Sequence, residues 1–114
     1  MAEELGFCEL EVAISEAHDQ VGFEGPAGMV ELGISGEVKE LYDQFVASAP
    51  EEIRAEVEST TERFVALIDI WERANGDPDQ VDRAEQDLAM ERFFSGANEA
   101  ADEVVGAWLE ENCR

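Results

Sequence analysis

The residues that could act as nucleophiles, bases or metal ligands are few and far apart in this chain. A single histidine, His18, stands beside Asp19, and the two cysteines are Cys8 and Cys113. Catalysis usually needs a base or nucleophile with a tuned pKa, yet the sequence contains no G-x-S-x-G nucleophile motif. The segment GFEGPAG lacks the lysine and the preceding strand of a phosphate-binding loop. We therefore expect a structural role for His18, no enzymatic activity and no cofactor.

Oxygen donors gather in one segment, NGDPDQVDRAEQD, which begins at Asn75. A calcium-binding EF-hand loop starting there would need glycine at its sixth position and glutamate at its twelfth. Those positions hold Gln80 and Gln86. One histidine and two distant cysteines also cannot form a zinc site. We expect a helix end followed by a new helix cap in this segment, and we predict no metal site.

Acidic side chains dominate the composition, with 29 Asp and Glu against seven Lys and Arg and a formal net charge of -22. Such a chain repels nucleic acid, and it lacks a basic segment that would bind an anionic membrane surface. Three interpretations of the acidity stay open. They are a surface adapted for solubility in a salty or extracellular setting, binding of a basic partner (including nucleic-acid mimicry), and cation binding.

Helical periodicity predicts the elements that would position these residues. Apolar residues spaced three and four apart run through residues 5–21, 36–49, 50–74, 78–94 and 96–113. No strand pattern and no internal repeat occurs, and 114 residues fit one domain. The sequence predicts a single all-α domain over residues 1–114, an antiparallel bundle of four to five helices. No apolar run reaches the roughly 20 residues of a membrane-spanning helix, so we expect no transmembrane segment in this chain.

Three segments carry more detailed predictions. The stripe of the first helix comprises Phe7, Leu10, Ile14, Ala17 and Val21. The stripe of the last helix comprises Ala97, Ala101, Val104 and Trp108. Between the first two helices, residues 22–36 hold five glycines and a proline, which predicts a Gly-rich loop packed on the core, or a lid over a pocket. In the long third helix, Asp69 and Arg73 are spaced for an ion pair four residues apart.

One aromatic pair suggests a contact surface. Phe93 and Phe94 are adjacent, so both cannot face one core from a single helix. One of them would be exposed, covered by the Gly-rich loop, or part of an interface. Together with the loop residues Phe23 and Met29, they form the candidate surface for contact with an unknown protein or small ligand.

The two cysteines lie near the start of the first predicted helix and at the end of the last. In an up-and-down bundle with an even number of main helices these two ends are neighbours. Cys8 and Cys113 could then meet at a Cα separation of about 5.5 Å. A disulfide there would tie down termini that otherwise fray and would imply an oxidising compartment. The alternative is two unrelated buried thiols in a cytosolic protein.

Three segments of the chain, GFCELEVAI, ASAPEEIRAEVES and ANEAADEVVGAWLEENC, resemble a group of small, secreted, helical actinobacterial proteins. These are mostly uncharacterised, and many are lipid-anchored or carry a signal peptide. The resemblance covers about half of the chain and implies export and a Cys8–Cys113 disulfide, but it implies no activity. Two features depart from the pattern: Arg114 follows the last cysteine where glycine is common, and the Gly-rich loop is longer.

These observations lead to two functional hypotheses. The first is a small, acidic, extracytoplasmic helical module, secreted or associated with the cell envelope, with a binding or structural role and a monomeric or weakly dimeric state. The second is a cytoplasmic, salt-adapted adaptor or inhibitor that binds a basic partner. The second hypothesis predicts free thiols and strong stabilisation by molar salt, because screening relieves repulsion among the acidic groups.

Overall fold

The computed structural model describes residues 6–22 and 25–113, and this part of the chain folds into helices joined by turns, without strands. The six α-helices of the described part are α1 (Phe7–Val21), α2 (Gly25–Glu31), α3 (Ser35–Ala47), α4 (Arg54–Arg73), α5 (Arg83–Phe93) and α6 (Gly96–Cys113). Two short 3-10 helices, η2 (Glu51–Ile53) and η3 (Pro78–Gln80), precede α4 and α5. The predicted all-α bundle is confirmed.

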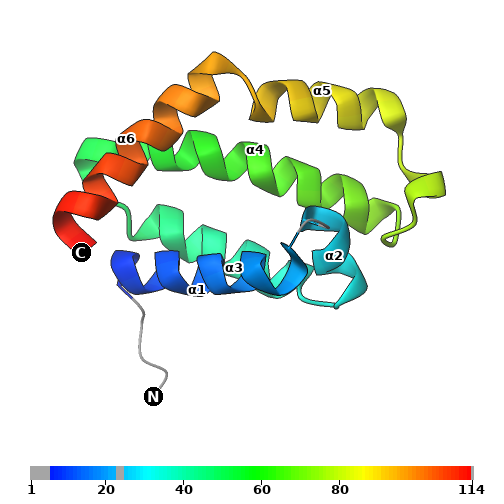
Figure 1. Cartoon of the computed structure of the whole chain (residues 1–114), viewed down its shortest axis with the longest axis horizontal. Helices are drawn as coiled ribbons and strands as arrows, with labels where there is room; N and C mark the ends of the chain where they lie inside the picture. Colours follow the sequence, from blue (N-terminus) through cyan, green and yellow to red (C-terminus); the bar gives the residue numbers. More distant parts are fainter. Residues whose placement is uncertain (1–5, 23–24, 114) are drawn as a thin grey trace.

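The long helix α4 occupies the centre of the bundle (Figure 1). It contacts α2, α3, α5 and α6, while α1 packs along α3. In Figure 1, α1 and α3 lie on one side of α4 and α5 lies on the other, and α6 crosses α4 towards the start of α1. The helix pairs α1/α3, α3/α4 and α4/α5 run in opposite directions, as expected in an antiparallel bundle, whereas α6 continues in roughly the direction of α5 after a bend (Figure 1).

The Gly-rich segment contains a helix, α2, where the sequence predicts a loop. Gly22, Gly25 and Gly33 have φ values of 55°, 54° and 73°, which side chains rarely adopt, so the chain turns sharply before and after α2. Pro26 lies in the first turn of α2, where its missing N–H costs nothing. Met29 is fully buried and holds this short helix on the core.

The first helix follows its periodic pattern. All five predicted stripe residues are buried, and they are the buried residues of α1: Phe7, Leu10, Ile14, Ala17 and Val21. The same face contributes to both hydrophobic clusters of the core.

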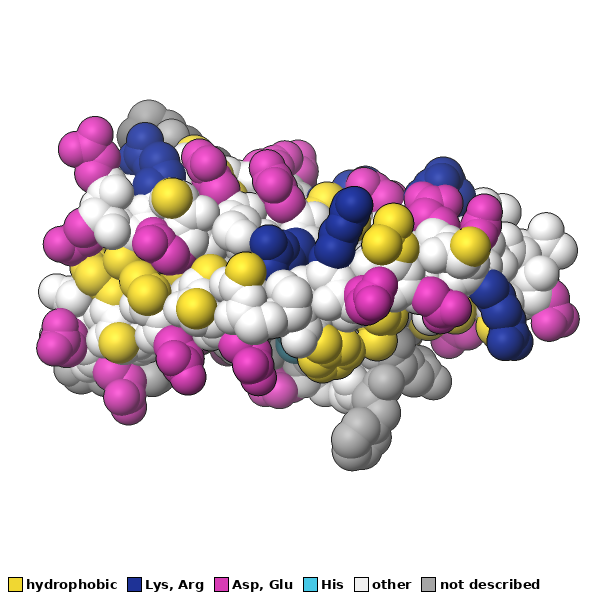
Figure 2. Space-filling model, turned by 90° about the horizontal axis from the view of Figure 1, so that it is seen from above, with side chains coloured by type: hydrophobic (Ala, Val, Ile, Leu, Met, Phe, Trp, Pro, Cys, Tyr) yellow, Lys and Arg dark blue, Asp and Glu magenta, His cyan; other side chains and the backbone are white. Residues whose placement is uncertain are grey.

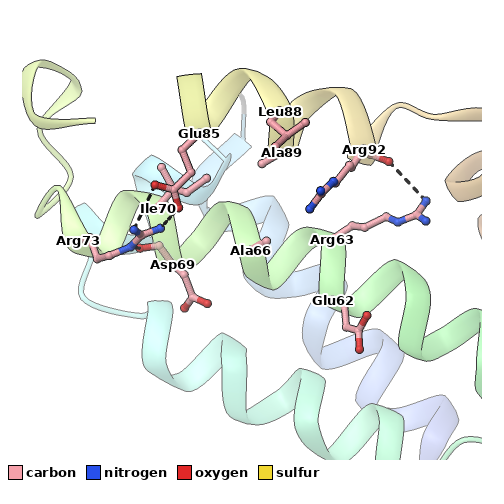
Figure 3. A pocket seen from close by; sticks show the side chains of 10 residues that line it. All are labelled: Glu62, Arg63, Ala66, Asp69, Ile70, Arg73, Glu85, Leu88, Ala89 and Arg92. Atoms are coloured by element: carbon pink, nitrogen blue, oxygen red, sulfur yellow. Dashed lines mark hydrogen bonds and ion pairs between the residues drawn. The ribbon is translucent and has the colours of Figure 1, made fainter. Parts of the chain in front are cut away.

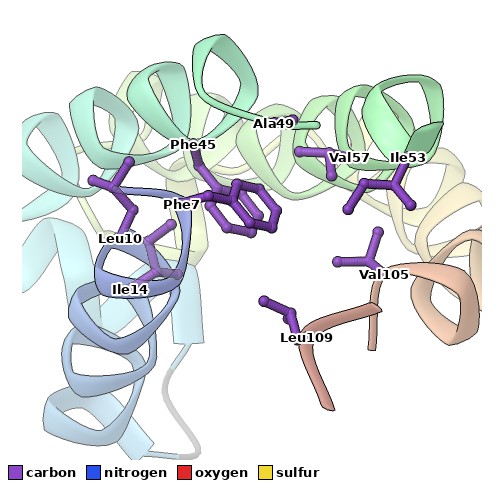
Figure 4. Packing of buried hydrophobic residues seen from close by; sticks show 9 residues of the cluster. All are labelled: Phe7, Leu10, Ile14, Phe45, Ala49, Ile53, Val57, Val105 and Leu109. Carbon is purple, nitrogen blue, oxygen red and sulfur yellow. The ribbon is translucent and has the colours of Figure 1, made fainter. Parts of the chain in front are cut away.

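The first core cluster joins both ends of the chain to the end of α3 and the start of α4, at one end of the bundle (Figure 1). Figure 4 shows its nine buried members: Phe7, Leu10, Ile14, Phe45, Ala49, Ile53, Val57, Val105 and Leu109. The rings of Phe7 and Phe45 stack with centroids 4.2 Å apart, and Trp108 meets Phe7 edge-on at 5.4 Å. Such aromatic pairs add stability beyond the area they bury.

The stripe predicted for the last helix is shifted by one residue. The buried residues of α6 are Asn98, Ala101, Val105 and Leu109. Of the predicted stripe only Ala101 is buried, and Val104 is 42% exposed. The shift places a polar side chain, Asn98, at the first buried position of the helix.

The apolar stripe predicted along α5 is wrong. Among the described residues, α5 contains none that is buried. Leu88, Met90 and Phe94 are exposed, Leu88 to 49%. The helix packs mainly against α4, and the remaining side of α5 faces solvent (Figure 1).

The segment before α5 forms the predicted helix end and new cap. Asn75 and Gly76 adopt positive φ values of 53° and 76°, which end α4. The Asp77 carboxylate accepts a hydrogen bond from the Asp79 backbone N–H, and the Asp82 carboxylate caps α5 by accepting from the Glu85 N–H. Both carboxylates are therefore used as hydrogen-bond acceptors for backbone N–H groups.

The ion pair predicted between Asp69 and Arg73 does not form. Lys39 on α3 donates to Asp69 at 2.7 Å and to Glu72 at 2.6 Å, and hydrogen bonds to these carboxylates raise the pKa of Lys39. Arg73 pairs with Glu85 on α5. Contacts between helices therefore replace the contact within α4.

Candidate functional site

The structure joins Cys8 and Cys113 in a disulfide. Their Cα atoms lie 5.6 Å apart, within the usual range for such bonds. Cys113 packs against the first core cluster, so the bond fixes the end of α6 beside the start of α1. The predicted terminal disulfide is confirmed as a structural link.

The four residues of the predicted contact surface do not come together. Phe23 lies outside the described residues. Met29 is fully buried in the second core cluster, so it cannot contact a partner. Phe93 is half-buried, with its ring 6.0 Å from that of Phe64, whereas Phe94 is 67% exposed. Of the described members, Phe94 alone presents most of its side chain to solvent.

A cavity of about 430 Å³ lies between α1, α3, α4, the end of α5 and α6. Five of its lining residues have aromatic side chains, counting imidazole, and they come from four helices: His18, Tyr42, Phe45, Phe64 and Phe93. The others are Glu11, Ile14, Ser15, Thr60, Asn98, Asp102, Val105, Gly106 and Leu109. We call this space the interhelical cavity. Its volume is in the range of sites for small molecules.

His18 and Tyr42 form a hydrogen-bonded pair on one wall of the interhelical cavity. His18 Nε2 lies 2.8 Å from the Tyr42 hydroxyl oxygen, and the His18 ring lies against Phe64 with centroids 4.7 Å apart. Burial lowers the pKa of His18, although the Asp19 carboxylate opposes this shift. Burial, with a smaller contribution from the Asp102 charge, raises the pKa of Tyr42 well above its usual range. Both groups are therefore neutral near pH 7.

The raised pKa of Tyr42 also bears on reactivity. A phenol or imidazole that acts as nucleophile or general base needs a pKa matched to the working pH. Burial moves Tyr42 away from such a value. The pair is better suited to hydrogen bonding and aromatic contact than to proton transfer.

Asn98 carries an unpaired acceptor at the interhelical cavity. The residue is 2% exposed, and its Nδ2 donates to the Phe93 carbonyl oxygen at 2.7 Å. That carbonyl requires a donor, which fixes the orientation of the amide. Its Oδ1 is buried and has no hydrogen-bond partner among the described residues. Leaving a buried acceptor unpaired costs about 1–3 kcal/mol. The Oδ1 atom itself is buried, so a ligand that donates to it recovers this free energy once the surrounding side chains shift to expose it.

Carboxylates complete the polar lining. Asp102 lies one turn after Asn98 on α6, and burial raises the pKa of its carboxyl. Glu11 on α1 accepts a hydrogen bond from Ser15 Oγ at 3.3 Å. No Lys or Arg belongs to the lining. The interhelical cavity therefore combines aromatic walls with hydrogen-bond acceptors and negative charge.

The sequence pattern did not reveal this cavity. Phe45, Phe64 and Leu109 line it, and they occupy buried positions that periodicity alone assigns to a packed core. The only signal in the sequence was a polar residue, Asn98, close to the apolar stripe of the last helix.

A second hollow, about 540 Å³, lies between α4 and α5 (Figure 3). Arg63 and Arg92 lie at one end of it, and Arg73 lies at the other end beside Glu85 (Figure 3). Arg63 donates to the Arg92 carbonyl and, at 3.0 Å, to Ser95 Oγ. The lining also includes three carboxylates, those of Glu62, Asp69 and Glu85. Acidic and basic groups are thus equal in number in this hollow, which gives it no strong preference for an anion.

Acidic side chains are spread over the whole face of the molecule shown in Figure 2, and the few basic ones are scattered among them. No large single-sign basic patch interrupts the acidic groups on this face. The negative field of the protein therefore acts on any ligand that approaches either hollow.

Comparisons with protein-family models, with curated proteins and with solved structures gave no match to this chain. Within residues 6–22 and 25–113, no group of three or more His, Cys, Asp and Glu side chains is placed to hold a metal ion. No helix in the same part of the chain is both long and apolar enough to cross a membrane.

Proposed function

We propose that this protein is a small binding module that holds a ligand in the interhelical cavity and has no catalytic activity of its own. The observation that carries the proposal is the buried, unpaired Oδ1 of Asn98 beside an aromatic wall. A buried acceptor without a partner is uncommon in folded proteins and calls for an explanation. A bound ligand that donates a hydrogen bond supplies one.

A cavity-filling variant tests the proposal directly. Gly106 lies on α6 and lines the interhelical cavity, and a Cβ there would meet no atom within 4 Å. Gly106→Leu should therefore fold and occupy part of the cavity. Gly36→Leu is the matched control, because Gly36 is also helical and has the same free space but lines none of the described hollows.

The measurement is a titration with small aromatic probes of positive, zero and negative charge, followed by ¹H–¹⁵N NMR. We expect at least one probe to shift the Asn98 side-chain amide and the amides of Phe64 and Asp102 in a saturable way. Gly106→Leu should abolish these shifts, and Gly36→Leu should retain them. No saturable shift with any probe, or equal binding by Gly106→Leu, would contradict ligand binding in this cavity.

We also propose that the module acts outside the cytoplasm, secreted or associated with the cell envelope. The Cys8–Cys113 disulfide supports this, because such bonds persist mainly in oxidising compartments. The resemblance to secreted actinobacterial proteins supports it as well. Thiol alkylation of the protein as isolated from its own cells, read by intact mass with and without reduction, is the test. We expect no label before reduction.

The second candidate function is a cytoplasmic, salt-adapted protein that binds a basic partner, which the net charge of -22 favours. It predicts that both thiols take the label in the folded protein without reduction. It also predicts that the partner dissociates as salt rises, because exposed charges more than about 10 Å apart are screened at 0.1 M ionic strength.

A further inference from the structure

We propose that the ligand of the interhelical cavity is a protonated amine attached to an apolar or aromatic body. This inference rests on the proposed function and specifies its ligand. Three features of the lining, together with the charge of the whole protein, favour a cation that carries N–H groups over a neutral molecule or an anion.

The first feature is that the lining groups without a hydrogen-bond partner are acceptors. Asn98 Oδ1 is an acceptor without a partner, in a residue that is 2% exposed. Asp102, an exposed residue one turn further along α6, makes no hydrogen bond or ion pair with any described residue. An ionised carboxylate only accepts hydrogen bonds. The ligand must therefore supply donors, and an ammonium group has up to three.

The second feature is charge. The lining includes the acidic side chains of Asp102 and Glu11 and no basic side chain. Asp102 is an exposed residue at the edge of the interhelical cavity, where its carboxylate can contact a bound cation. His18 adds no positive charge near pH 7, because burial lowers its pKa.

The third feature is the aromatic wall. Phe64 lies at its centre, with the rings of His18, Tyr42 and Phe93 at centroid distances of 4.7, 5.5 and 6.0 Å. The negative face of an aromatic ring attracts a cation within about 6 Å of its centroid. The same rings also provide apolar contact for the body of the ligand.

The fourth feature is the field of the whole protein. A net charge of -22 raises the local concentration of cations and lowers that of anions around the molecule. The field alone does not define a site, but it acts in the same direction as the lining of the interhelical cavity.

A matched set of probes separates the contributions of charge and shape. 2-Phenylethylamine, 2-phenylethanol and phenylacetate share a phenyl ring and a two-carbon chain but differ in charge. Affinities are measured by NMR titration at pH 7 and 0.15 M salt, where weak binding to the acidic surface is screened. We expect the amine to bind at least tenfold more tightly than the alcohol and the carboxylate not to bind.

Two variants locate the charge effect. Asp102→Asn should weaken binding of 2-phenylethylamine at least tenfold and leave the affinity for 2-phenylethanol unchanged. Glu103→Gln is the control, because Glu103 is the next residue on α6, is exposed like Asp102, lines none of the described hollows, and its substitution changes the net charge equally. It should bind the amine like the unmodified protein.

The outcomes distinguish this inference from the proposed function. Equal affinity for the amine and the alcohol, or an equal effect of Asp102→Asn and Glu103→Gln, would overturn the amine while ligand binding in the cavity stands. If none of the three probes shifts the cavity residues of the unmodified protein, the amine is refuted. If no probe of the wider aromatic set does so either, the proposed function fails as well.

Discussion

Breaking the Cys8–Cys113 disulfide should remove a large part of the stability of the fold. The bond links residues separated by 105 positions, and in the chain-entropy model a loop of about that length contributes about 4.7 kcal/mol to the free energy of unfolding. Domains of this size are stable by about 5–15 kcal/mol in total, so the loss is about a third or more of that stability. The variant carrying Cys8→Ala and Cys113→Ala should therefore be much less stable than the unmodified protein at room temperature.

Urea unfolding followed by circular dichroism is the appropriate assay, because guanidinium chloride is a salt and would screen the repulsion among the acidic groups. With a slope of about 1–3 kcal/mol per molar urea, the midpoint should fall by between about 1.6 and 4.7 M. The unmodified protein after chemical reduction is the matched comparison, since it keeps every atom of both side chains. A loss below about 1 kcal/mol in both samples, against the 2–4 kcal/mol typical of disulfides, would refute the reasoning that the bond limits the freedom of the unfolded chain.

Further predictions concern the core, the ion pairs and pH. Phe7→Ala should lower the free energy of unfolding by about 3–5 kcal/mol, because the ring stacks on Phe45 in the first core cluster. Leu88→Ala, on the exposed side of α5, should change the free energy of unfolding by less than about 0.5 kcal/mol. Equal losses in urea unfolding would show that the core is assigned wrongly. Lys39→Met should cost at most about 1 kcal/mol, since its two ion pairs are about one-third to one-half exposed, and the loss should shrink in 1 M salt. A loss that does not change with salt would argue against an electrostatic origin. Burial lowers the pKa of His18 in the folded state, so the folded protein binds this proton less well than the unfolded chain. The contribution of His18 to the free energy of unfolding should therefore be complete above about pH 6.5 and should be lost as pH drops below that value. His18→Gln should remove this dependence of stability on pH. The same pH dependence in the variant between pH 7 and 5 would rule out His18 as its source.

The periodic pattern of the first helix gave an accurate prediction. The stripe of α1 matches its buried residues because that helix interleaves apolar and charged side chains and packs its apolar side along α3. The Asn75-Gly76 pair also predicted the end of α4, because backbone conformation there depends on local residue type.

The register of α6 was predicted wrongly for a physical reason. Small and apolar residues occur on several sides of this helix, so two registers fit a spacing of three and four almost equally well. The observed one buries Asn98, which a hydrophobic stripe excludes. Its burial depends on the Phe93 carbonyl at the end of α5, to which its amide donates. That contact arises from the turn between two helices and leaves no periodic trace in the sequence.

The interhelical cavity could not be predicted for a related reason. Its walls come from α1, α3, α4, α6 and the last residue of α5, and an apolar residue that lines a cavity has the same periodicity as one that fills a core. The same limit explains why Met29 was wrongly predicted to be part of a contact surface. An apolar residue in a Gly-rich segment can be exposed or buried, and the sequence did not show that α2 would bury Met29 in the second core cluster.

The disulfide, the acidity and the unpaired Asn98 acceptor make opposing contributions to stability. Repulsion among acidic groups destabilises the compact state. A buried acceptor without a partner costs further free energy. The disulfide between α1 and α6 opposes both effects, and it lies at the same end of the bundle as the first core cluster. It therefore stabilises a chain whose charge and whose buried polar group both favour unfolding.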